Sequence, residues 1–265
     1  MSSRKEQKEQ ARLAREQKER ELAAQSARTR RMTIIGGVFG LALVAVVVAV
    51  IVSSGAFKSK NVSGADTVAS RFAGIPQRGV ELGEKNAPAT LEEFADLKCP
   101  FCREFALNSL PTLVSDYVKT GKMKIIFRNV TILDQNTPGT PDSTNAATFA
   151  AATGFQNKLW NFVDLFYINQ KDEATTYVTD KYLRQLGNQV SGLDVNKAFQ
   201  DRGSKAVTAQ LDLAKAGYTK NGAPGTPYFL VGPTNGKLQN VELSDLGDPS
   251  PITDIVDSLQ PGASQ

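Results

Sequence analysis

Cys99 and Cys102 are the only cysteines among the 265 residues of this chain, and the chain contains no histidine. A structural zinc site needs four Cys or His ligands, and a c-type haem needs a histidine directly after the second cysteine. A Ser-His-Asp or Cys-His catalytic site needs a histidine as well. The counts therefore argue against these chemistries within one chain. A short structural disulfide and a redox-active dithiol remain, and we favour the dithiol because so short a closed loop constrains the unfolded chain little.

The two cysteines lie between a predicted strand and a predicted helix. Residues 90–97 read TLEEFADL and are strand-like, whereas residues 100–120 are predicted to be helical. The helix begins with Pro100, which is well tolerated in a first turn because its missing N–H would have no partner there. Residues 123–133, MKIIFRNVTIL, are rich in strand-forming side chains and predict a second strand. The cysteines are thus expected at the turn of a strand-helix-strand unit.

The pattern changes after this unit. Residues 138–217 are alanine-rich with apolar residues at a period near 3.6, which predicts an all-helical block. Strand character returns at residues 227–231 and 237–243, and residues 252–259 predict a last short helix. We therefore expect one domain over residues 75–262 that contains a helical insertion.

An apolar segment precedes this domain. No charged residue occurs in residues 32–57, and the first 21 of these, as a helix, would cover about 30 Å, one bilayer core. Residues 32–53 are therefore predicted to be a transmembrane helix, and residues 54–74, with little apolar periodicity, an extracytoplasmic linker. A cleaved signal peptide is the alternative, because Ser54-Gly55-Ala56 has the small side chains of a cleavage site. The long polar tail before it favours an uncleaved anchor.

The basic residues of the N-terminal tail predict the orientation of the anchor. Residues 1–31 contain ten of the 31 Lys and Arg residues, and Arg28, Arg30 and Arg31 stand directly before the apolar segment. Because positive charge stays on the cytoplasmic side, the N-terminus is expected in the cytoplasm of a single-pass protein of the cell membrane. The domain with both cysteines would then be extracytoplasmic, where thiols are not kept reduced.

The charge balance also bears on nucleic-acid binding. The pI of about 9.0 and the net charge of +4 come from the N-terminal tail, and the rest of the chain is nearly neutral. No basic stripe interleaved with aromatic residues occurs outside the tail. We therefore expect no nucleic-acid partner.

Three sequence features together resemble the DsbA-like proteins of thioredoxin fold. They are Cys99-Pro100-Phe101-Cys102 between strand and helix, Gly225-Thr226-Pro227 directly before a strand, and the helical block between them. The likeness covers about residues 74–260. It implies an α/β, thioredoxin-like fold with an all-helical insertion, here preceded by one N-terminal transmembrane helix. It also implies a thiol:disulfide oxidoreductase whose redox group is the Cys99-Cys102 disulfide, with no metal or other cofactor.

The expected roles of the two cysteines follow from their place at the start of a helix. Cys99 would face unpaired N–H groups and the positive end of the helix dipole, which favour thiolate over thiol. Cys99 is therefore the predicted nucleophile, and Cys102, one turn further along, the resolving thiol. Lys98 and Arg103 are cationic neighbours of this site, and we interpret them as solvated surface charges rather than as groups that stabilise the thiolate.

The residues around the cysteines have expected roles by resemblance. The best-known oxidases have histidine after the proline, whereas this chain has Phe101, so we expect a less oxidising potential. Pro227 matches the family's cis-proline, with an ordinary trans turn as the alternative. In the cis form the Thr226 backbone would pair with an extended substrate, and Pro100 and Phe101 would contact the same peptide.

Glu93 lies six positions before Cys99 in an otherwise apolar part of the strand. An acid at this place in thioredoxin-like folds lies beneath the cysteines. By analogy Glu93 would relay a proton to or from Cys102, with a pKa raised by burial. A solvent-facing Glu93 is the alternative, and Glu92 and Asp96 are rival candidates for the relay.

The function predicted from these features is disulfide donation by a membrane-anchored thiol:disulfide oxidoreductase. Its expected substrates are extended or unfolded exported proteins that contain cysteines. By resemblance, a membrane protein of the DsbB or VKOR type would reoxidise it. A disulfide reductase or isomerase with the same site, and a tethered binding module or chaperone without catalysis, are the alternatives.

Overall fold

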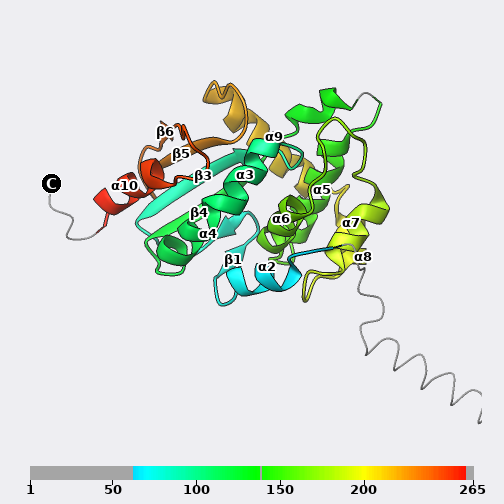
Figure 1. Cartoon of the computed structure of the whole chain (residues 1–265), viewed down its shortest axis with the longest axis horizontal. Coiled ribbons are helices and arrows are strands. Elements are labelled where there is room, and N and C mark those ends of the chain that lie inside the picture. Colours follow the sequence, from blue (N-terminus) through cyan, green and yellow to red (C-terminus); the bar gives the residue numbers. More distant parts are fainter. Residues whose placement is uncertain (1–61, 138, 261–265) are drawn as a thin grey trace, which may run out of the picture. The chain divides into compact units, whose positions relative to one another are not determined.

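The computed structural model describes residues 62–137 and 139–260 (Figure 1). The predicted cytoplasmic tail, transmembrane helix and first part of the linker lie outside these residues. Among the helices of the described part, none combines the length and the apolar character needed to cross a membrane.

A six-stranded sheet forms the centre of the domain, with strand order β1-β2-β4-β3-β5-β6. Strands β3 and β4 run parallel, and every other neighbouring pair is antiparallel. The two parallel strands are almost entirely buried, which explains their nearly continuous apolar sequences. The strands are β1 (Gln77–Arg78), β2 (Glu81–Leu82), β3 (Ala89–Ala95), β4 (Met123–Asn129), β5 (Tyr228–Pro233) and β6 (Gln239–Val241).

Helices cover both faces of the sheet. They are α2 (Ala65–Arg71), α3 (Pro100–Asn108), α4 (Leu110–Leu113), α5 (Asp142–Gly154), α6 (Leu159–Ile168), α7 (Asp180–Gly187), α8 (Val195–Asp201), α9 (Lys205–Lys220) and α10 (Ser250–Ser258). A π-helical turn, Val114–Val118, follows α4, and a 3-10 turn, Ile132–Asn136, follows β4. Helices α5 to α9 occupy the segment in which the 3.6-residue period predicts helices.

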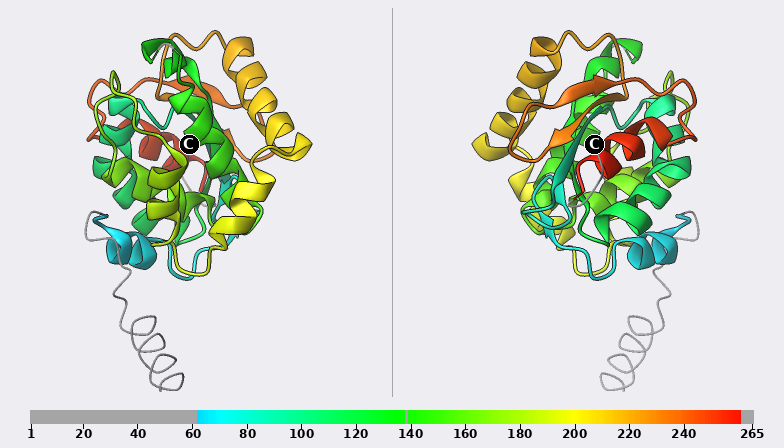
Figure 2. Two further views of the ribbon diagram at one scale, coloured as in Figure 1. Left: turned by 90° about the vertical axis from the view of Figure 1, so that its right-hand side faces the viewer. Right: turned by 90° about the vertical axis from the view of Figure 1, so that its left-hand side faces the viewer.

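Each face of the sheet has its own hydrophobic cluster. The larger one includes Phe229 and Val231 of β5 together with Ile252 of α10 and residues of α3 and α6. The smaller one joins Leu230, the residue between them in β5, to Ala214 of α9. Because side chains alternate along a strand, α9 and α10 lie on opposite faces of the sheet, as Figure 2 shows.

The prediction of a linker over residues 54–74 is wrong for the part of this segment that the structure describes. Residues 65–71 form α2, which packs against α6, and Val68 and Phe72 are buried. Arg71 pairs with the buried Asp164 of α6 at 2.6 Å. Val68 and Phe72, four positions apart, lie on one helical face. Small and polar residues surround these two apolar positions, so the sequence shows no clear helical periodicity here.

Other predicted elements differ in length. The helix expected over residues 100–120 stops at Asn108 and resumes as α4, in which Pro111 has no N–H for the preceding turn. The strand expected over 123–133 ends at Asn129, and the strand expected over 237–243 is only three residues long. The hairpin of β1 and β2 is not evident in the sequence, because two-residue strands carry no periodicity.

Candidate active site

Cys99 stands at the first position before α3 and has extended backbone angles, with φ −72° and ψ 122°. Pro100 is the first residue of the helix and fits the turn for the reason expected from the sequence. Cys99 is 4% exposed, and Cys102, one turn into the helix, is completely buried. Phe101 between them is 59% exposed. The motif therefore presents an apolar ring to solvent, beside one thiol that is almost buried and another that is completely buried.

The surroundings of Cys99 favour its thiolate. The hydrogen bond with the Cys102 thiol has the largest effect, and weaker bonds with the Thr226 side chain and with the backbone N–H groups of Phe101 and Cys102 add to it. Together they outweigh burial and lower the pKa of Cys99 to about 7. At neutral pH a substantial fraction of Cys99 is thus in the reactive form.

Cys102 has the opposite character. Burial raises the pKa of the Cys102 thiol well above its ordinary value, and the hydrogen bond to Cys99 and the charges of Cys99 and Glu93 raise it further. A thiolate at Cys102 is therefore disfavoured while Cys99 is ionised. The chain thus distinguishes the two sulfur atoms: one ionises readily, and the other retains its proton.

The Thr226–Pro227 peptide bond is cis and lies opposite Cys99. The Cys99 Sγ donates to the carbonyl oxygen of Thr226 at 3.2 Å, so the structure brings together residues 127 positions apart in the chain. A groove of about 560 Å³ begins at this loop. Glu242 and Leu246, which follow β6, also line it.

Glu93 lies on the core face of β3 and is 2% exposed. Its Oε1 atom has no hydrogen-bond partner, and burial raises the pKa of its carboxyl group to about 8. When Glu93 is ionised, its charge adds to the rise in the pKa of Cys102. Glu93 therefore holds its proton at neutral pH, as a group that supplies a proton to Cys102 must.

The rival acids are engaged elsewhere. Glu92 points to the other face of β3 and pairs with Arg128 at 2.6 Å. The carboxylate of Asp96 accepts hydrogen bonds from the backbone N–H groups of Lys98 and Leu133 and from the hydroxyl of Ser143. Burial nevertheless raises the pKa of Asp96 to about 6. Asp96 thus fixes the turn before Cys99, whereas Glu93 remains the acid with an unpaired oxygen.

Lys98 is not a solvated surface charge, and the expectation from sequence is wrong here. Its side chain is completely buried. The Nζ atom pairs with Asp142 at 3.2 Å, donates to the carbonyl oxygen of Thr175 at 2.6 Å and lies over the ring of Tyr177. Arg103 donates to the carbonyl oxygen of Tyr167. Both cations thus hold the helical insertion against the active-site turn.

Two further residues contact this turn, and no sequence pattern indicates them. The hydroxyl of Tyr167, at the end of α6, donates to the carbonyl oxygen of Asp96 at 3.3 Å. The side chain of Gln170, just beyond α6, donates to the carbonyl oxygens of Leu97 and Cys99. Both lie about 70 positions from their partners in a segment with only core-like periodicity, so no local signal could identify them.

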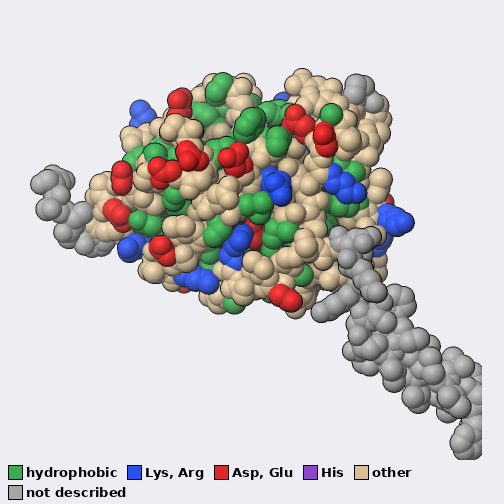
Figure 3. All heavy atoms as spheres, viewed as in Figure 1, with side chains coloured by type: hydrophobic (Ala, Val, Ile, Leu, Met, Phe, Trp, Pro, Cys, Tyr) green, Lys and Arg blue, Asp and Glu red, His purple; other side chains and the backbone are tan. Residues whose placement is uncertain are grey.

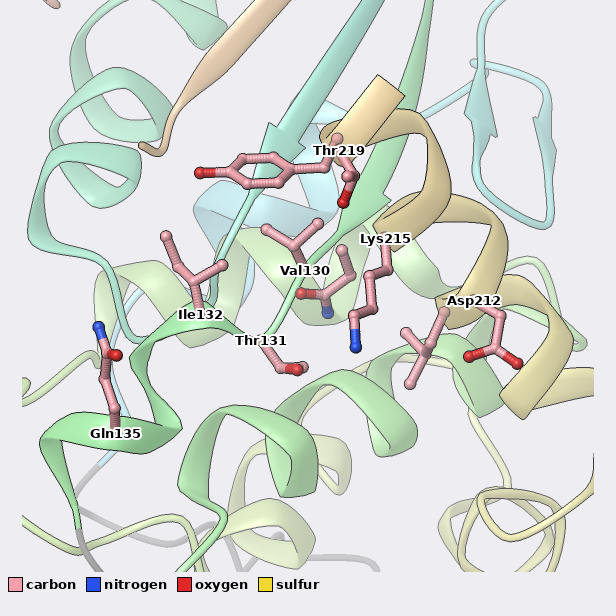
Figure 4. A pocket seen from close by; sticks show the side chains of 10 residues that line it. Val130, Thr131, Ile132, Gln135, Asp212, Lys215 and Thr219 are labelled. Carbon is pink, nitrogen blue, oxygen red and sulfur yellow. The ribbon is translucent and has the colours of Figure 1, made fainter. Parts of the chain in front are cut away.

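A second hollow, of about 550 Å³, lies on the α9 side of the sheet (Figure 4). Asp212 and Lys215 of α9 line it together with Thr131 and Ile132, which follow β4. Neither the cysteines nor the cis-proline loop line this hollow, so it lies outside the candidate active site.

A family model described as thioredoxin matches residues 77–243, which include both cysteines and the cis-proline. The chain belongs to this thioredoxin family. The thioredoxin-like α/β fold expected from the sequence is therefore confirmed.

Several individual bacterial proteins are similar to this chain. A protein of Bacillus anthracis named probable disulfide bond formation protein D is 28% identical over 166 residues, which are 62% of this chain and 73% of that protein. The crystal structure of oxidised BdbD from Bacillus subtilis has a TM-score of 0.57 at 21% identity and covers 70% of this chain and 96% of that one. Wolbachia pipientis alpha-DsbA1 has a TM-score of 0.54 at 22% identity, with coverages of 72% and 95%. These structural matches support the thioredoxin-like fold.

Proposed function

We propose that this protein is a thiol:disulfide oxidoreductase that donates the Cys99-Cys102 disulfide to cysteines of exported proteins. The observation that carries the proposal is the asymmetry of the two thiols at the start of α3. The pKa of Cys99 is lowered to about 7, and the pKa of the buried Cys102 is raised. The name of the Bacillus anthracis relative, probable disulfide bond formation protein D, supports the same direction of reaction.

The first step is attack of a substrate thiolate on the Cys99 sulfur of the disulfide. The Cys99–Cys102 bond breaks, the electron pair leaves with Cys102, and a mixed disulfide joins the substrate to Cys99. Cys102 is buried, so its thiolate must take up a proton. Protonated Glu93 is the proposed source, because its carboxyl group is buried on the same face and has a pKa of about 8.

The second step releases the oxidised substrate. A second substrate thiolate attacks the substrate sulfur of the mixed disulfide, and Cys99 leaves as a thiolate. Two electrons have then passed from the substrate dithiol, which becomes a disulfide, to the Cys99-Cys102 disulfide, which becomes a dithiol. Because Cys99 has a low pKa, it is a good leaving group, and the reduced enzyme is stabilised relative to the oxidised one. Both effects favour donation of the disulfide.

The surface around Cys99 suits an extended peptide. The backbone of Thr226, directly before cis-Pro227, lies within hydrogen-bond distance of Cys99, and main-chain pairing with an extended chain is sequence-tolerant. Pro100 and the exposed ring of Phe101 supply apolar contacts beside it. We therefore propose extended or unfolded proteins with cysteines as substrates.

The proposal includes a place in the cell and a partner. Residues 32–53 would anchor the protein in the cell membrane, with residues 1–31 in the cytoplasm and the domain outside. A membrane protein of the DsbB or VKOR type would take the two electrons and reoxidise the pair. These parts derive from the sequence and from the family resemblance.

Replacement of the resolving thiol tests the catalytic part. The Cys102→Ala variant should accumulate mixed disulfides between Cys99 and exported proteins, visible on non-reducing gels and removed by dithiothreitol. The Cys99→Ala variant is the control and should accumulate none. A protein whose cellular role persists without either cysteine would instead be a binding module or chaperone.

The direction of the reaction has a separate test. Equilibration of the exported domain with glutathione gives its reduction potential, and the native thiol state in cells shows which form predominates. A disulfide donor should have a potential above that of thioredoxin, about −270 mV, and a largely oxidised population. A potential well below that value, with a reduced population, would indicate a reductase.

A further inference from the structure

Among the side chains of the helical insertion, Gln170 makes two hydrogen bonds to the backbone of the active-site turn. Its Nε2 group donates to the carbonyl oxygen of Leu97 at 2.8 Å and to that of Cys99 at 3.0 Å. Gln170 stands two residues beyond the end of α6, and its backbone N–H is bonded to Tyr167 of that helix. The two carbonyls therefore connect directly to the insertion on both sides of Lys98.

These two carbonyl oxygens have few other partners. Leu97 is completely buried, so water cannot replace a lost donor. The Cys99 carbonyl accepts the first N–H of the helix, from Arg103, at 3.2 Å, and a carbonyl oxygen has a second lone pair for Gln170. Gln170 thus holds both Leu97, at the entry to the turn, and Cys99, the residue directly before α3.

Other contacts also hold this turn: the Cys99 N–H donates to the carbonyl oxygen of Asp96 at 3.0 Å, and the Tyr167 hydroxyl donates to the same oxygen. Asp96 is held through its own side chain, and the Lys98 ammonium group binds Asp142 and Thr175. Within the described part of the chain, no other side chain donates to the carbonyl of Leu97 or Cys99. Gln170 is therefore the side chain that holds the carbonyl groups on both sides of Lys98, where the turn leads into α3.

We propose that Gln170 is a positioning residue for Cys99, which holds the nucleophile at the start of α3 in the orientation that disulfide exchange requires. The inference rests on the proposed function, because it concerns the same thiol. Loss of the amide group frees the backbone on both sides of Lys98. The Cys99 sulfur then spends less time near the N–H groups of Phe101 and Cys102, which stabilise its thiolate.

Gln170→Met is the test variant, because methionine has similar length and volume but no N–H donor. The thiolate absorbance at 240 nm, followed against pH in the reduced full chain, reports the pKa of Cys99. We expect a rise of about 0.5 units or more, which is roughly a threefold loss in the ratio of thiolate to thiol. The equilibrium with glutathione should shift toward the disulfide form of the protein by a similar factor.

The chain offers a matched control in Gln156. This glutamine also lies in the insertion and makes two hydrogen bonds to the backbone, both with Asp194, at 2.9 and 2.8 Å. Gln156→Met should reduce stability without moving the Cys99 pKa or the glutathione equilibrium. An equal shift in both variants would mean general loosening of the insertion and would overturn the inference.

The remaining outcomes are also decisive. A Gln170→Met protein with the wild-type pKa and equilibrium would overturn the positioning role while the wild-type exchange activity still stood. Wild-type protein without exchange toward peptide thiols would instead overturn the proposed function. If Gln170→Met does not fold, Gln170→Asn retains the amide but is one methylene too short to reach both carbonyls, and it should raise the pKa in the same direction.

Discussion

The ammonium group of Lys98 and the carboxylate of Asp142 form an ion pair of 3.2 Å in the interior, with side-chain exposures of 0% and 2%. Lys98 directly precedes the candidate nucleophile, and Asp142 is the first residue of α5. The same carboxylate accepts the backbone N–H groups of Tyr177 and Val178. The thioredoxin-like part and its helical insertion are thus joined by buried charges beside the cysteines. Surface views cannot show this pair, because in Figure 3 only exposed charges are visible.

Substitution of Lys98 by methionine should destabilise the protein strongly. It leaves the Asp142 carboxylate buried without its cation, and removal of one partner of a buried pair costs about 3–5 kcal/mol. Urea unfolding of the full chain measures the change. Lys197→Met is the control, since its pair with Asp201 is largely exposed and should contribute less than about 1 kcal/mol. Equal losses in the two variants would contradict a special role of the buried pair.

Alkylation of the reduced protein should distinguish the two thiols by pH. Because the pKa of Cys99 is lowered to about 7, its reaction with iodoacetamide should reach half its maximal rate near pH 7. Cys102 should stay unreactive there, because burial raises its pKa. Peptide mass spectrometry after a short pulse locates the label.

The Cys102→Ala variant is informative in the same assay. The hydrogen bond with Cys102 is the largest influence on Cys99, so its loss should move the midpoint of Cys99 alkylation to higher pH. A wild-type midpoint near 9, the ordinary value for a thiol, would contradict the assigned environment.

Glu93 should make stability depend on pH. Burial raises the pKa of its carboxyl group from 4.5 to about 8, so the folded protein binds a proton that the unfolded chain releases. The stabilisation that this proton provides is fully present below pH 4.5. As pH rises toward 8, the free energy of unfolding falls by about 1.4 kcal/mol per pH unit. Glu93→Gln should therefore be more stable than wild type at pH 8, by roughly 3–5 kcal/mol, and similar near pH 4.5.

Unfolding at several pH values checks this prediction. Other buried acids, including Asp96 and Asp164, titrate in the same range, so the difference between variant and wild type is the relevant quantity. Glu104→Gln, at an exposed position of α3, should leave the pH profile unchanged. If Glu93→Gln also slows formation of the Cys102 thiol, the carboxyl group acts as the proton source as well.

Phe101 should contribute to binding of protein substrates but not to the exchange chemistry itself. Its ring is 59% exposed beside Cys99, so Phe101→Ala removes apolar contact area that only a bound chain would cover. We expect KM for an unfolded cysteine-containing protein to rise about 3- to 10-fold, equivalent to about 1 kcal/mol. Exchange with glutathione should change little.

The control for that experiment is another exposed aromatic residue. Phe155→Ala, 45% exposed at the end of α5, should affect neither substrate. A Phe101→Ala protein with an unchanged KM would show that the peptide binds without this ring, through the Thr226 loop and the adjoining groove.

Much of the fold was predictable because it depends on local patterns. The sequence of β3, the proline at the start of α3 and the alanine-rich period of α5 each determine a local element. The limits of these elements were less predictable. Pro111 ends one helix and begins another, and α2 is stabilised by burial of Val68 and Phe72 against α6 rather than by strong periodicity.

By itself the sequence determined the chemistry that is available: two thiols three positions apart, no histidine, and a helix start beside them that favours a thiolate. Only the tertiary structure decided which groups are deprived of water and which partners replace it. Glu93 and Lys98 are both charged residues near the cysteines in sequence, yet one is buried with an unpaired oxygen and the other is neutralised by Asp142. Desolvation and pairing depend on segments such as Asp142, Gln170 and Thr226, which lie 44 to 127 positions from the turn and reach it only in the folded chain.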